Sequence, residues 1–274
     1  MRNSLVQSVE RAVGILECFV GDQAMMGISE LAHRGGVSKA TAHRLAATLV
    51  ARGWLDRYRS TRRYRLGPRV IALGGLAQSR SELIGLAAPF MATLRDLSGE
   101  TVQLSLRGDA RHHFTIYRVE SPHAIRMTAT LGEQRPLHLG CSGKAILAFR
   151  PPSEQNRLLP HGRSFAFASG IARSALYIKK DLARIRSRGY AETIEELTPG
   201  AAGIGVPILG SDGFAVASLY ISGPTARFSP SQRTRCAPRL VQAGQAISER
   251  LGFRGPICPP APDRRPWRQR RKIS

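Results

Sequence analysis

The sequence has few cysteines, few aromatic residues and no long hydrophobic run. The four cysteines, Cys18, Cys141, Cys236 and Cys258, include no CxxC pair. They therefore indicate neither a zinc ribbon nor a dense disulfide framework, and they fit a reducing compartment. No stretch approaches the roughly 18 consecutive apolar residues of a membrane helix. The first residues, MRNSLVQSVERA, are charged before any apolar core, unlike a secretory signal. We expect a cytoplasmic protein that does not span a membrane.

Acidic residues are also scarce. Aspartate and glutamate number 19 against 41 lysines and arginines, which gives a formal net charge of +22. Residues 1–80 carry 13 basic and 5 acidic residues, a net charge of +8, and residues 254–274 carry 7 and 1, a net charge of +6. Positive charge of this density indicates a polyanionic partner, and double-stranded DNA is the leading candidate. The alternative is a charge that serves only solubility.

The histidines and cysteines show no metal-ligand spacing. The seven histidines form no HExxH or comparable motif. His112 and His113 are adjacent, so they cannot both point the same way along a strand. We expect no metal site and no cofactor.

Residues 8–53 show the helix order of a helix-turn-helix module. Apolar residues at spacings of three and four predict a first helix over residues 8–20. Its predicted buried face consists of Val9, Val13, Leu16 and Val20. A short second helix over residues 28–34 stops at two glycines, and Ser38 is a suitable N-cap for a third helix that ends at Gly53.

The third helix has an apolar side and a side with small and basic residues. On a helical wheel, Ala42, Leu45 and Leu49 share the apolar side. The opposite side holds Ala40, His43, Arg44 and Ala47, with Lys39 at the N-terminal end. Small residues allow close approach, and basic ones donate to phosphates or base edges. This pattern predicts a helix that enters a major groove.

A basic hairpin follows the third helix. The segment WLDRYRSTRRYRLGP predicts two short strands that turn at Ser60 and Thr61. Its arginines are Arg57, Arg59, Arg62, Arg63 and Arg65. A basic hairpin behind a recognition helix is typical of a wing that contacts the DNA backbone or minor groove. The alternative is a small packing module with a solvated, charged hairpin.

The segments VQSVERAVGILECF, ISELAHRGGVSKATAHRLAATLVARGWL and YRLGPRVIALGG resemble the DNA-binding part of IclR-type bacterial transcriptional regulators. The resemblance implies that the third helix reads operator DNA. It places these residues at DNA: Ser38, Lys39, Ala40, Thr41, His43 and Arg44, with Arg59, Arg62 and Arg63 in the wing. Such proteins often carry serine at the position of Ala40, so one hydroxyl contact is lost here.

The remainder of the chain mixes helices and strands. The pattern predicts a linker helix and a second helix interrupted near Pro89, where proline kinks a helix. Strands are predicted over residues 101–106, 114–119, 125–130, 204–209 and 214–221, and helices over 179–188 and 238–252. Strands and helices in this order, with a hairpin at residues 211–213, predict an α+β domain with an antiparallel sheet.

This second part is similar to the IclR effector-binding domain, which implies a GAF-like fold. The matching segments include GETVQLSL, RPLHLGCSGKAILAF and SLYISGP. We therefore expect four parts, in chain order: a winged helix-turn-helix domain over 5–67, a linker helix over 68–81, an effector-binding domain over 82–253 and a basic tail over 254–274. Proline and charge in the tail oppose a packed core there, which indicates disorder. The alternative is a non-specific phosphate contact that adds DNA affinity at low salt.

The resemblance also implies a small-molecule site. The residues that match its binding positions are Met127, Cys141, Ser142, Thr193, Gly203, Tyr220 and Ser222. The resemblance implies a small organic or aromatic acid as the effector. Free N–H groups where a loop enters a helix attract a carboxylate, which agrees with this expectation. Relatives often have a carboxylate, a cysteine and a small residue where Thr193, Gly203 and Tyr220 stand.

The enzyme motifs that come closest are incomplete. GCSGKA would need glycine at 138 and serine or threonine at 145 to form a P-loop, and the residues there are His138 and Ala145. Cys141 near His138 would also need an orienting group and an oxyanion site to act as a nucleophile. We expect no enzyme activity.

The predicted function is a ligand-responsive transcriptional regulator that binds pseudo-palindromic operator DNA as a homodimer. Family members often pair further into tetramers. Two other classes remain open at this point: a DNA-binding regulator without a functional sensor, and an enzyme with an accessory DNA-binding domain.

Overall fold

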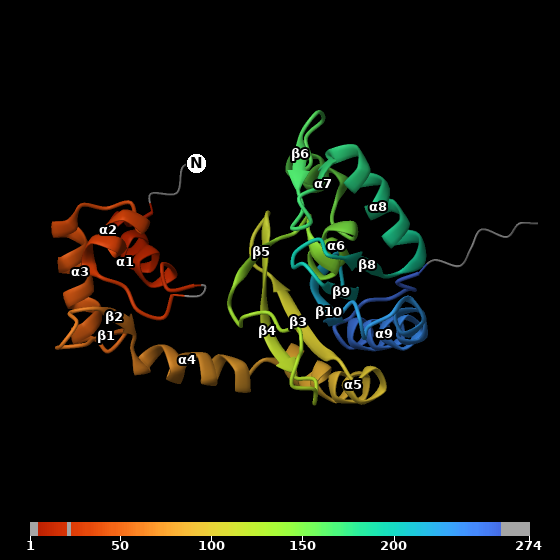
Figure 1. Cartoon of the computed structure of the whole chain (residues 1–274), viewed down its shortest axis with the longest axis horizontal. Helices are drawn as coiled ribbons and strands as arrows, with labels where there is room; N and C mark the ends of the chain where they lie inside the picture. The colour runs from red at the N-terminus through yellow and green to blue at the C-terminus, as the bar shows by residue number, and fades with distance from the viewer. Residues whose placement is uncertain (1–4, 21–22, 259–274) are drawn as a thin grey trace, which may run out of the picture. The chain divides into compact units, whose positions relative to one another are not determined.

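The computed structural model describes residues 5–20 and 23–258 (Figure 1). The chain divides into two compact units. One consists of the residues up to Gly85 together with Thr130–Gln134, and the other consists of Leu86–Ala129 and the residues from Arg135 onward.

The N-terminal unit contains the predicted helix-turn-helix and wing. Its helices are α1 (Gln7–Glu17), α2 (Ile28–Arg34) and α3 (Lys39–Ala51), followed by the antiparallel strands β1 (Leu55–Arg57) and β2 (Tyr64–Leu66). Ser38 caps α3, because its side chain accepts a hydrogen bond from the backbone N–H of Thr41 at 3.2 Å. Buried side chains from all three helices and both strands form one core, among them Ile15, Leu31, Ala46, Leu55 and Tyr64.

The predicted buried face of the first helix is wrong at three of its four residues, Val9, Val13 and Val20, whereas Leu16 packs against the core. Ile15 and Phe19 are the residues that this segment buries, whereas Val9 and Val13 are 59% and 46% exposed. Ile15 lies on the last turn of α1, and Phe19 follows the end of the helix and reaches the same core. The segment thus has two apolar faces, and the core of the unit covers only one of them.

Two helices follow the wing. Helix α4 (Pro68–Ser79) has Pro68 at its first turn, and no residue of this fully described helix is buried. Helix α5 (Glu82–Ser98) runs through Pro89 without a break, which corrects the predicted interruption. Proline removes only one backbone hydrogen bond, and burial of Ala87, Met91 and Leu94 stabilises the helix around it.

The second unit is built on a six-stranded sheet with the order β5-β4-β3-β10-β9-β8. Its strands are β3 (Thr101–Arg107), β4 (His112–Val119), β5 (Gln134–Pro136), β8 (Ala191–Ile194), β9 (Ala201–Leu209) and β10 (Ala215–Pro224). The pairs β3–β4, β3–β10, β9–β10 and β8–β9 are antiparallel. These helices and this sheet confirm the α+β fold class, with a winged helix-turn-helix before an antiparallel-sheet domain.

The strand predicted over residues 125–130 does not form. Side chains satisfy part of the backbone of this segment instead. Gln103 Oε1 accepts from the Ala129 N–H at 2.8 Å, and Ser222 Oγ donates to the Met127 carbonyl at 3.3 Å. Side chains of β3 and β10 therefore hold this segment, which adds no strand to the sheet. The edge strand next to β4 is β5.

Helices cover both faces of the sheet. The helices of this unit after α5 are α6 (Gly140–Ala148), α7 (Pro152–Leu158), α8 (Ala175–Arg188) and α9 (Pro230–Arg250). Gly203 and Gly205 of β9 face Cys141 of α6, whereas Val206 faces Gly244 of α9, so α6 and α9 lie on opposite faces. Strands β6 (Ser164–Ala166) and β7 (Ala172–Ser174) form a separate hairpin.

The last helix starts earlier than residue 238, and the chain after it does not begin as a free tail. Ser229 caps α9, Pro230 occupies its first turn and Pro238 lies inside it. Ile257 is buried and its N–H donates to Gln245 at 2.8 Å, so the first residues of the predicted 254–274 tail pack on the domain. Residues 259–274 lie outside the described part of the chain.

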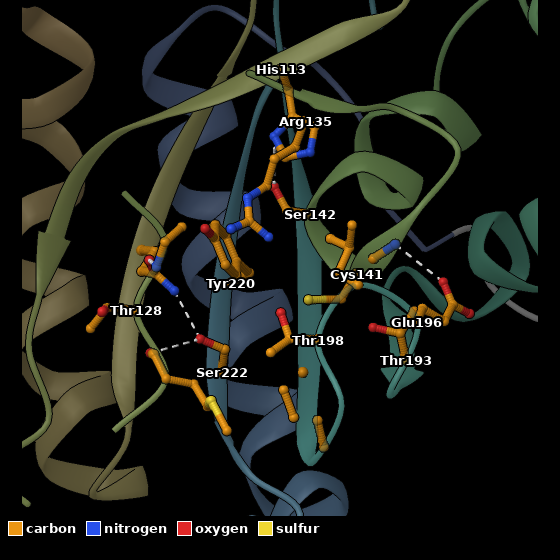
Figure 2. Close-up of a pocket in the computed structure, with 18 residues that line it drawn as sticks. His113, Thr128, Arg135, Cys141, Ser142, Thr193, Glu196, Thr198, Tyr220 and Ser222 are labelled. Carbon is orange, nitrogen blue, oxygen red and sulfur yellow. Dashed lines mark hydrogen bonds between the residues drawn. The ribbon is translucent and has the colours of Figure 1, made fainter. Parts of the chain in front are cut away.

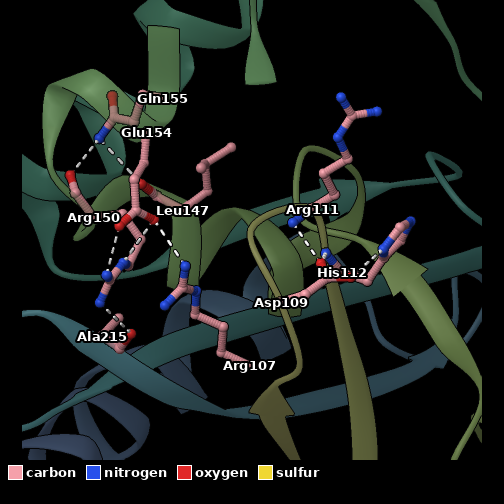
Figure 3. A network of polar contacts seen from close by, with 9 residues as sticks. All are labelled: Arg107, Asp109, Arg111, His112, Leu147, Arg150, Glu154, Gln155 and Ala215. Atoms are coloured by element: carbon pink, nitrogen blue, oxygen red, sulfur yellow. Dashed lines mark hydrogen bonds and ion pairs between the residues drawn. The ribbon is translucent and has the colours of Figure 1, made fainter. Parts of the chain in front are cut away.

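A polar network joins β3, α6 and α7 (Figure 3). Glu154 accepts one hydrogen bond from Arg107 at 3.0 Å and two from Arg150 at 2.7 and 3.1 Å. The bonds from Arg150, with the charge of Arg107, hold the pKa of Glu154 below its ordinary value. Because the pKa is lowered on folding, the stabilisation is present above the pKa of the unfolded chain and is lost as the pH falls through the folded value.

Glu154→Gln is expected to lower the free energy of unfolding by about 1.5–3 kcal/mol at neutral pH, the usual contribution of hydrogen bonds to a charged group. The difference from the wild type should begin to shrink as the pH falls below the pKa of the unfolded chain, about 4.3, and should vanish only below the lowered pKa of the folded state, where the carboxyl group is protonated in both states. Chemical denaturation across this pH range measures it. Asp96→Asn is the matched control, because the Asp96–Arg95 pair is exposed and should contribute less than about 1 kcal/mol. Equal losses of unfolding free energy in the two variants would contradict a stabilising role for the contacts of Glu154 with Arg107 and Arg150.

Candidate functional site

The third helix presents the predicted DNA-facing side to solvent. Lys39, Ala40, His43 and Arg44 are exposed, and Ala42, Ala46 and Leu49 are buried behind them. Ser38 and Thr41 also lie at this end of α3, but their hydroxyl groups bond each other at 2.9 Å. The geometry leaves Lys39, His43 and Arg44 as the exposed cationic or imidazole groups on one helix face, which is what contact with a DNA groove requires.

The wing arginines differ in their partners. Arg63 lies 3.7 Å from Glu30 of α2, and Arg65 pairs with Asp56 at 2.9 Å and donates to the Tyr58 hydroxyl at 2.7 Å. These contacts brace the hairpin. Arg59 and Arg62 are exposed, and Arg62 has a φ of 53° in the turn. The wing thus carries exposed positive charge next to α3, in the arrangement expected for contacts to phosphates.

In the second unit, one pocket brings together all seven residues predicted for the effector (Figure 2). They come from the segment before β5, the start of α6, and strands β8, β9 and β10. The pocket has a volume of about 120 Å³. It is slightly smaller than a cavity of about 150 Å³ that holds a benzene ring. That the seven residues bind an effector stays a prediction.

Tight packing forms the wall between α6 and β9. A Cβ at Gly203 would lie 2.7 Å from the Cys141 sulfur, and one at Gly205 would lie 2.9 Å from the Cys141 carbonyl oxygen. Both glycines are therefore needed for the first turn of α6 to lie against the strand. Burial raises the pKa of Cys141 to about 12, so its thiol stays protonated and is not an activated nucleophile.

Buried hydroxyl groups of α6 and β10 also line the pocket. Ser142 Oγ lies 2.8 Å from Ser218 Oγ and 3.3 Å from His113 Nδ1, and the Tyr220 hydroxyl lies 2.8 Å from Thr115 Oγ1. Burial raises the pKa of Tyr220 to about 12, so the phenol is neutral. These groups have partners within the protein, so their main effect is to fix the shape of the wall.

The helix start is already occupied by an acidic side chain. Glu196 Oε2 accepts from the Gly140 N–H at 3.1 Å, and Glu196 Oε1 pairs with the fully buried Lys144 at 2.5 Å. Lys144 also pairs with Asp181 at 2.9 Å. Burial raises the pKa of Glu196, and the Lys144 ammonium opposes that rise. The expectation that the N-terminus of α6 is open to a ligand carboxylate is therefore not met at Gly140.

The sequence reasoning missed six polar lining residues: Gln103, His113, Thr128, Arg135, Glu196 and Thr198. Gln103 donates to Ser222 at 2.8 Å and so holds a predicted binding residue in place. For the adjacent residues His112 and His113, the sequence predicted only that their side chains point to opposite sides of a strand, and it did not place either of them in the pocket. Arg135 directly precedes the Pro-Leu-His segment before α6. Its position beside a predicted binding loop is the sequence feature that could have indicated it as a lining residue.

Two general features of the described residues bear on function. Among them, no helix combines the length and apolar character that are needed to cross a membrane. Within the same residues, no three histidine, cysteine, aspartate or glutamate side chains gather as a metal-binding group.

Comparisons with known proteins agree on one family. Residues 8–58 match the IclR helix-turn-helix domain, and residues 76–249 match the C-terminal domain of the bacterial transcriptional regulator IclR. The chain is 31% identical over 244 residues to the HTH-type transcriptional regulator BhcR of Paracoccus denitrificans, covering 89% of this chain and 86% of that protein.

Solved structures share the fold. The IclR transcriptional regulator from Alicyclobacillus acidocaldarius is 25% identical with a TM-score of 0.83, covering 90% of this chain and 100% of that one. An IclR homologue from Microbacterium hydrocarbonoxydans, complexed with 4-hydroxybenzoate, is 24% identical with a TM-score of 0.74 and covers 89% of this chain and 98% of that one.

A winged helix-turn-helix followed by an antiparallel-sheet domain with its own pocket defines a two-domain DNA-binding transcriptional regulator. The chain belongs to the IclR family of bacterial transcriptional regulators.

Proposed function

We propose that this regulator binds operator DNA as a homodimer and changes its DNA affinity when a small organic acid occupies the pocket of the second unit. The pocket is the observation that carries the proposal. Residues from all six strands of the sheet, the start of α6 and the connecting segments converge on a space of about 120 Å³ with a mixed lining of apolar, hydroxyl and charged side chains. Concave sites with a few converging polar groups are the usual form of small-molecule sites.

The size and charge of the pocket support a small acid. A volume of this order admits a molecule of about the size of benzene. The guanidinium of Arg135 supplies positive charge in the lining, and Thr128, Thr193 and Thr198 supply hydroxyl groups. The Microbacterium homologue shows that this fold can be complexed with an aromatic hydroxy acid.

Exposed apolar faces support a homodimer. Val6, Val9 and Val13 share one face at the start of the chain and are 46–63% exposed. Helix α4 has no buried residue, and its Ile71 is 77% exposed. Apolar surface of this kind on one unit is typical of a protein interface. A two-fold dimer would place two copies of α3 on two half-sites of a pseudo-palindrome.

The effect of an acid on DNA binding follows from linkage. An acid that binds more tightly to one conformation shifts the population towards it, and it changes DNA affinity only as far as its two affinities differ. Fluorescence anisotropy with a fragment of the protein's own promoter, with and without a panel of small acids, tests the proposal. We expect the protein to bind the promoter fragment, and we expect at least one acid to change its affinity for that fragment. If no acid changes it, the chain is a DNA-binding regulator without a sensor.

Arg44→Ala is expected to weaken specific DNA binding by about 1–3 kcal/mol, the usual contribution of an arginine that reads a base edge. Arg44 is exposed in the middle of α3, so its removal should leave the fold intact. Titration of the promoter fragment and a random fragment at the same salt concentration measures the change. Arg52→Ala is the matched control, since Arg52 is exposed at the C-terminal end of the same helix. An unchanged preference for the promoter in Arg44→Ala would contradict a base contact.

A further inference from the structure

Tyr220 lies among small side chains on its face of the sheet. Its neighbours along β10 on this face are Ser218 and Ser222, because alternate residues of a strand share a face. The residue paired with it on β9 is Gly205, and the residue paired with it on β3 is Gln103. Three of these four neighbours are glycine or serine. The tyrosine ring therefore occupies space that the surrounding side chains leave open.

The ring of Tyr220 is fixed at its hydroxyl end. The hydroxyl lies 2.8 Å from Thr115 Oγ1, which lies 3.2 Å from Ser105 Oγ, and all three side chains are buried. A connected set of buried hydroxyl groups holds its members in one arrangement. In the view of Figure 2, the ring lies between Thr128 and Cys141, two other residues that line the pocket. The ring therefore acts on a ligand through its volume.

The space that remains beside the ring is small. It measures about 120 Å³, whereas a cavity of about 150 Å³ holds one benzene ring. With Tyr220 in place, the pocket therefore admits a whole ligand, acid group included, of about the size of benzene or less. A larger acid has to displace the ring, and this breaks its hydrogen bond with Thr115. A buried hydroxyl group that loses its partner is costly, so larger acids are disfavoured.

We infer that Tyr220 is the specificity-determining residue that sets the upper size limit of the effector, and that the effector is a short aliphatic acid. The acid group stays at the start of α6, where Glu196 takes only the Gly140 N–H. The N–H groups of Cys141 and Ser142 have no backbone acceptor within the helix, because they belong to its first turn. This inference rests on the proposed function, because it adds a size limit to the ligand of the same pocket.

The test begins with the order in which the wild-type protein binds acids of increasing size. Acetate, propionate, butyrate and lactate are compared with benzoate, phenylacetate and 4-hydroxybenzoate by calorimetry and thermal shift. At least one aliphatic acid should bind. Each aromatic acid should bind about 10-fold or more weakly than that acid, as expected when a group is forced into a filled site. Aromatic acids that bind as tightly as the best aliphatic acid would overturn the size limit while leaving a working sensor.

Variants of Tyr220 then test the ring itself. Tyr220→Ala removes it, and the aromatic acids should bind this variant about 10-fold or more tightly than they bind the wild type, with no gain for the aliphatic acids. Tyr220→Leu keeps part of the volume and should give an intermediate gain, so it carries the test if Tyr220→Ala does not fold. An order of acids that stays the same in Tyr220→Leu and in a folded Tyr220→Ala would overturn the inference.

Tyr220→Phe is the matched control, because it keeps the ring and removes only the hydroxyl group. It should preserve the wild-type order of acids, with each affinity ratio within about threefold. If Tyr220→Phe instead binds aromatic acids as well as Tyr220→Ala does, the hydroxyl group and not the volume of the ring sets the preference, which overturns the inference.

Phe228→Leu controls for a general loosening of the domain. Phe228 is fully buried in the same unit and is not among the described residues that line the pocket. This variant should melt at a lower temperature without ligand and keep the wild-type order of acids. A gain for aromatic acids in Phe228→Leu as large as in Tyr220→Ala would overturn the inference, because destabilisation alone would then admit them.

Failure of the proposed function has a different signature: no acid would stabilise the wild-type protein or change its affinity for the promoter fragment. In that case, aromatic acids that bind Tyr220→Ala would still support the size limit set by the ring. If no acid binds the wild type or any variant of Tyr220, both the proposed function and the size limit are overturned.

Discussion

Replacing both Val9 and Val13 by aspartate is expected to convert the protein to a monomer and to weaken operator binding by about 100-fold or more. The two side chains lie on the exposed apolar face of α1, and charges there would have to be desolvated in an interface. A dimer gains its DNA affinity from two linked half-site contacts, a gain of roughly 10²–10⁴, and a monomer loses it. Light scattering gives the oligomeric state, and anisotropy titration gives the affinity.

The control for this experiment is Val20→Asp. Val20 is also about half exposed, at 45%, but it lies beyond the end of α1. It changes the net charge in the same direction, so it reports any general electrostatic weakening of DNA binding. A dimeric Val9→Asp/Val13→Asp variant with wild-type affinity would contradict the role of this face in dimerisation.

Gly203→Ala is expected to destabilise the second unit by about 1–3 kcal/mol, as overpacking of a buried site does, and to abolish the response to acids. The new Cβ would lie 2.7 Å from the Cys141 sulfur and 3.2 Å from the Ile221 carbonyl oxygen. Cys141 is buried in the core cluster of this unit, so its side chain has little free space around it. Cys141 also lines the pocket, so a movement of its sulfur towards the pocket would fill space that a ligand needs. Thermal denaturation with and without an acid measures both effects.

Cys141→Ala in the Gly203→Ala background tests the cause. The Cβ of Cys141 is 3.8 Å from the position of the new methyl group, an ordinary contact, so removal of the sulfur relieves the clash. The double variant should be more stable than Gly203→Ala alone, with a coupling energy in the range of about 0.5–3 kcal/mol. Simple addition of the two single losses would show that the sulfur contact is not the source of the strain.

The DNA-binding surface could be predicted largely from local sequence. Helical periodicity alone decides which side chains share a face with Arg44, and the structure exposes Ala40, His43 and Arg44 while burying Ala42 and Leu49. The same reasoning was wrong for α1, where two apolar faces compete. Only packing against α2 and α3 selects Ile15 and Phe19 for the core and leaves Val9 and Val13 exposed.

The pocket depended on contacts between distant segments. The resemblance indicated seven lining residues, but it did not indicate Arg135 or Glu196, or the contact between Glu196 and Gly140. Sheet register sets these neighbours: Tyr220 pairs with Gln103 on one side and Gly205 on the other, and Thr193 pairs with Gly203. A shift of one residue in any of these pairs would turn the lining side chains to the other face of the sheet.

The sequence by itself determined the helix order, the cap at Ser38, the basic wing and the class of regulator, because these depend on the spacing of residues within short segments. The tertiary structure alone decided which face of α1 is covered and which polar side chains line the pocket. Those features arise where residues far apart in the sequence meet, and the energy of burying or pairing them exists only after the chain has folded.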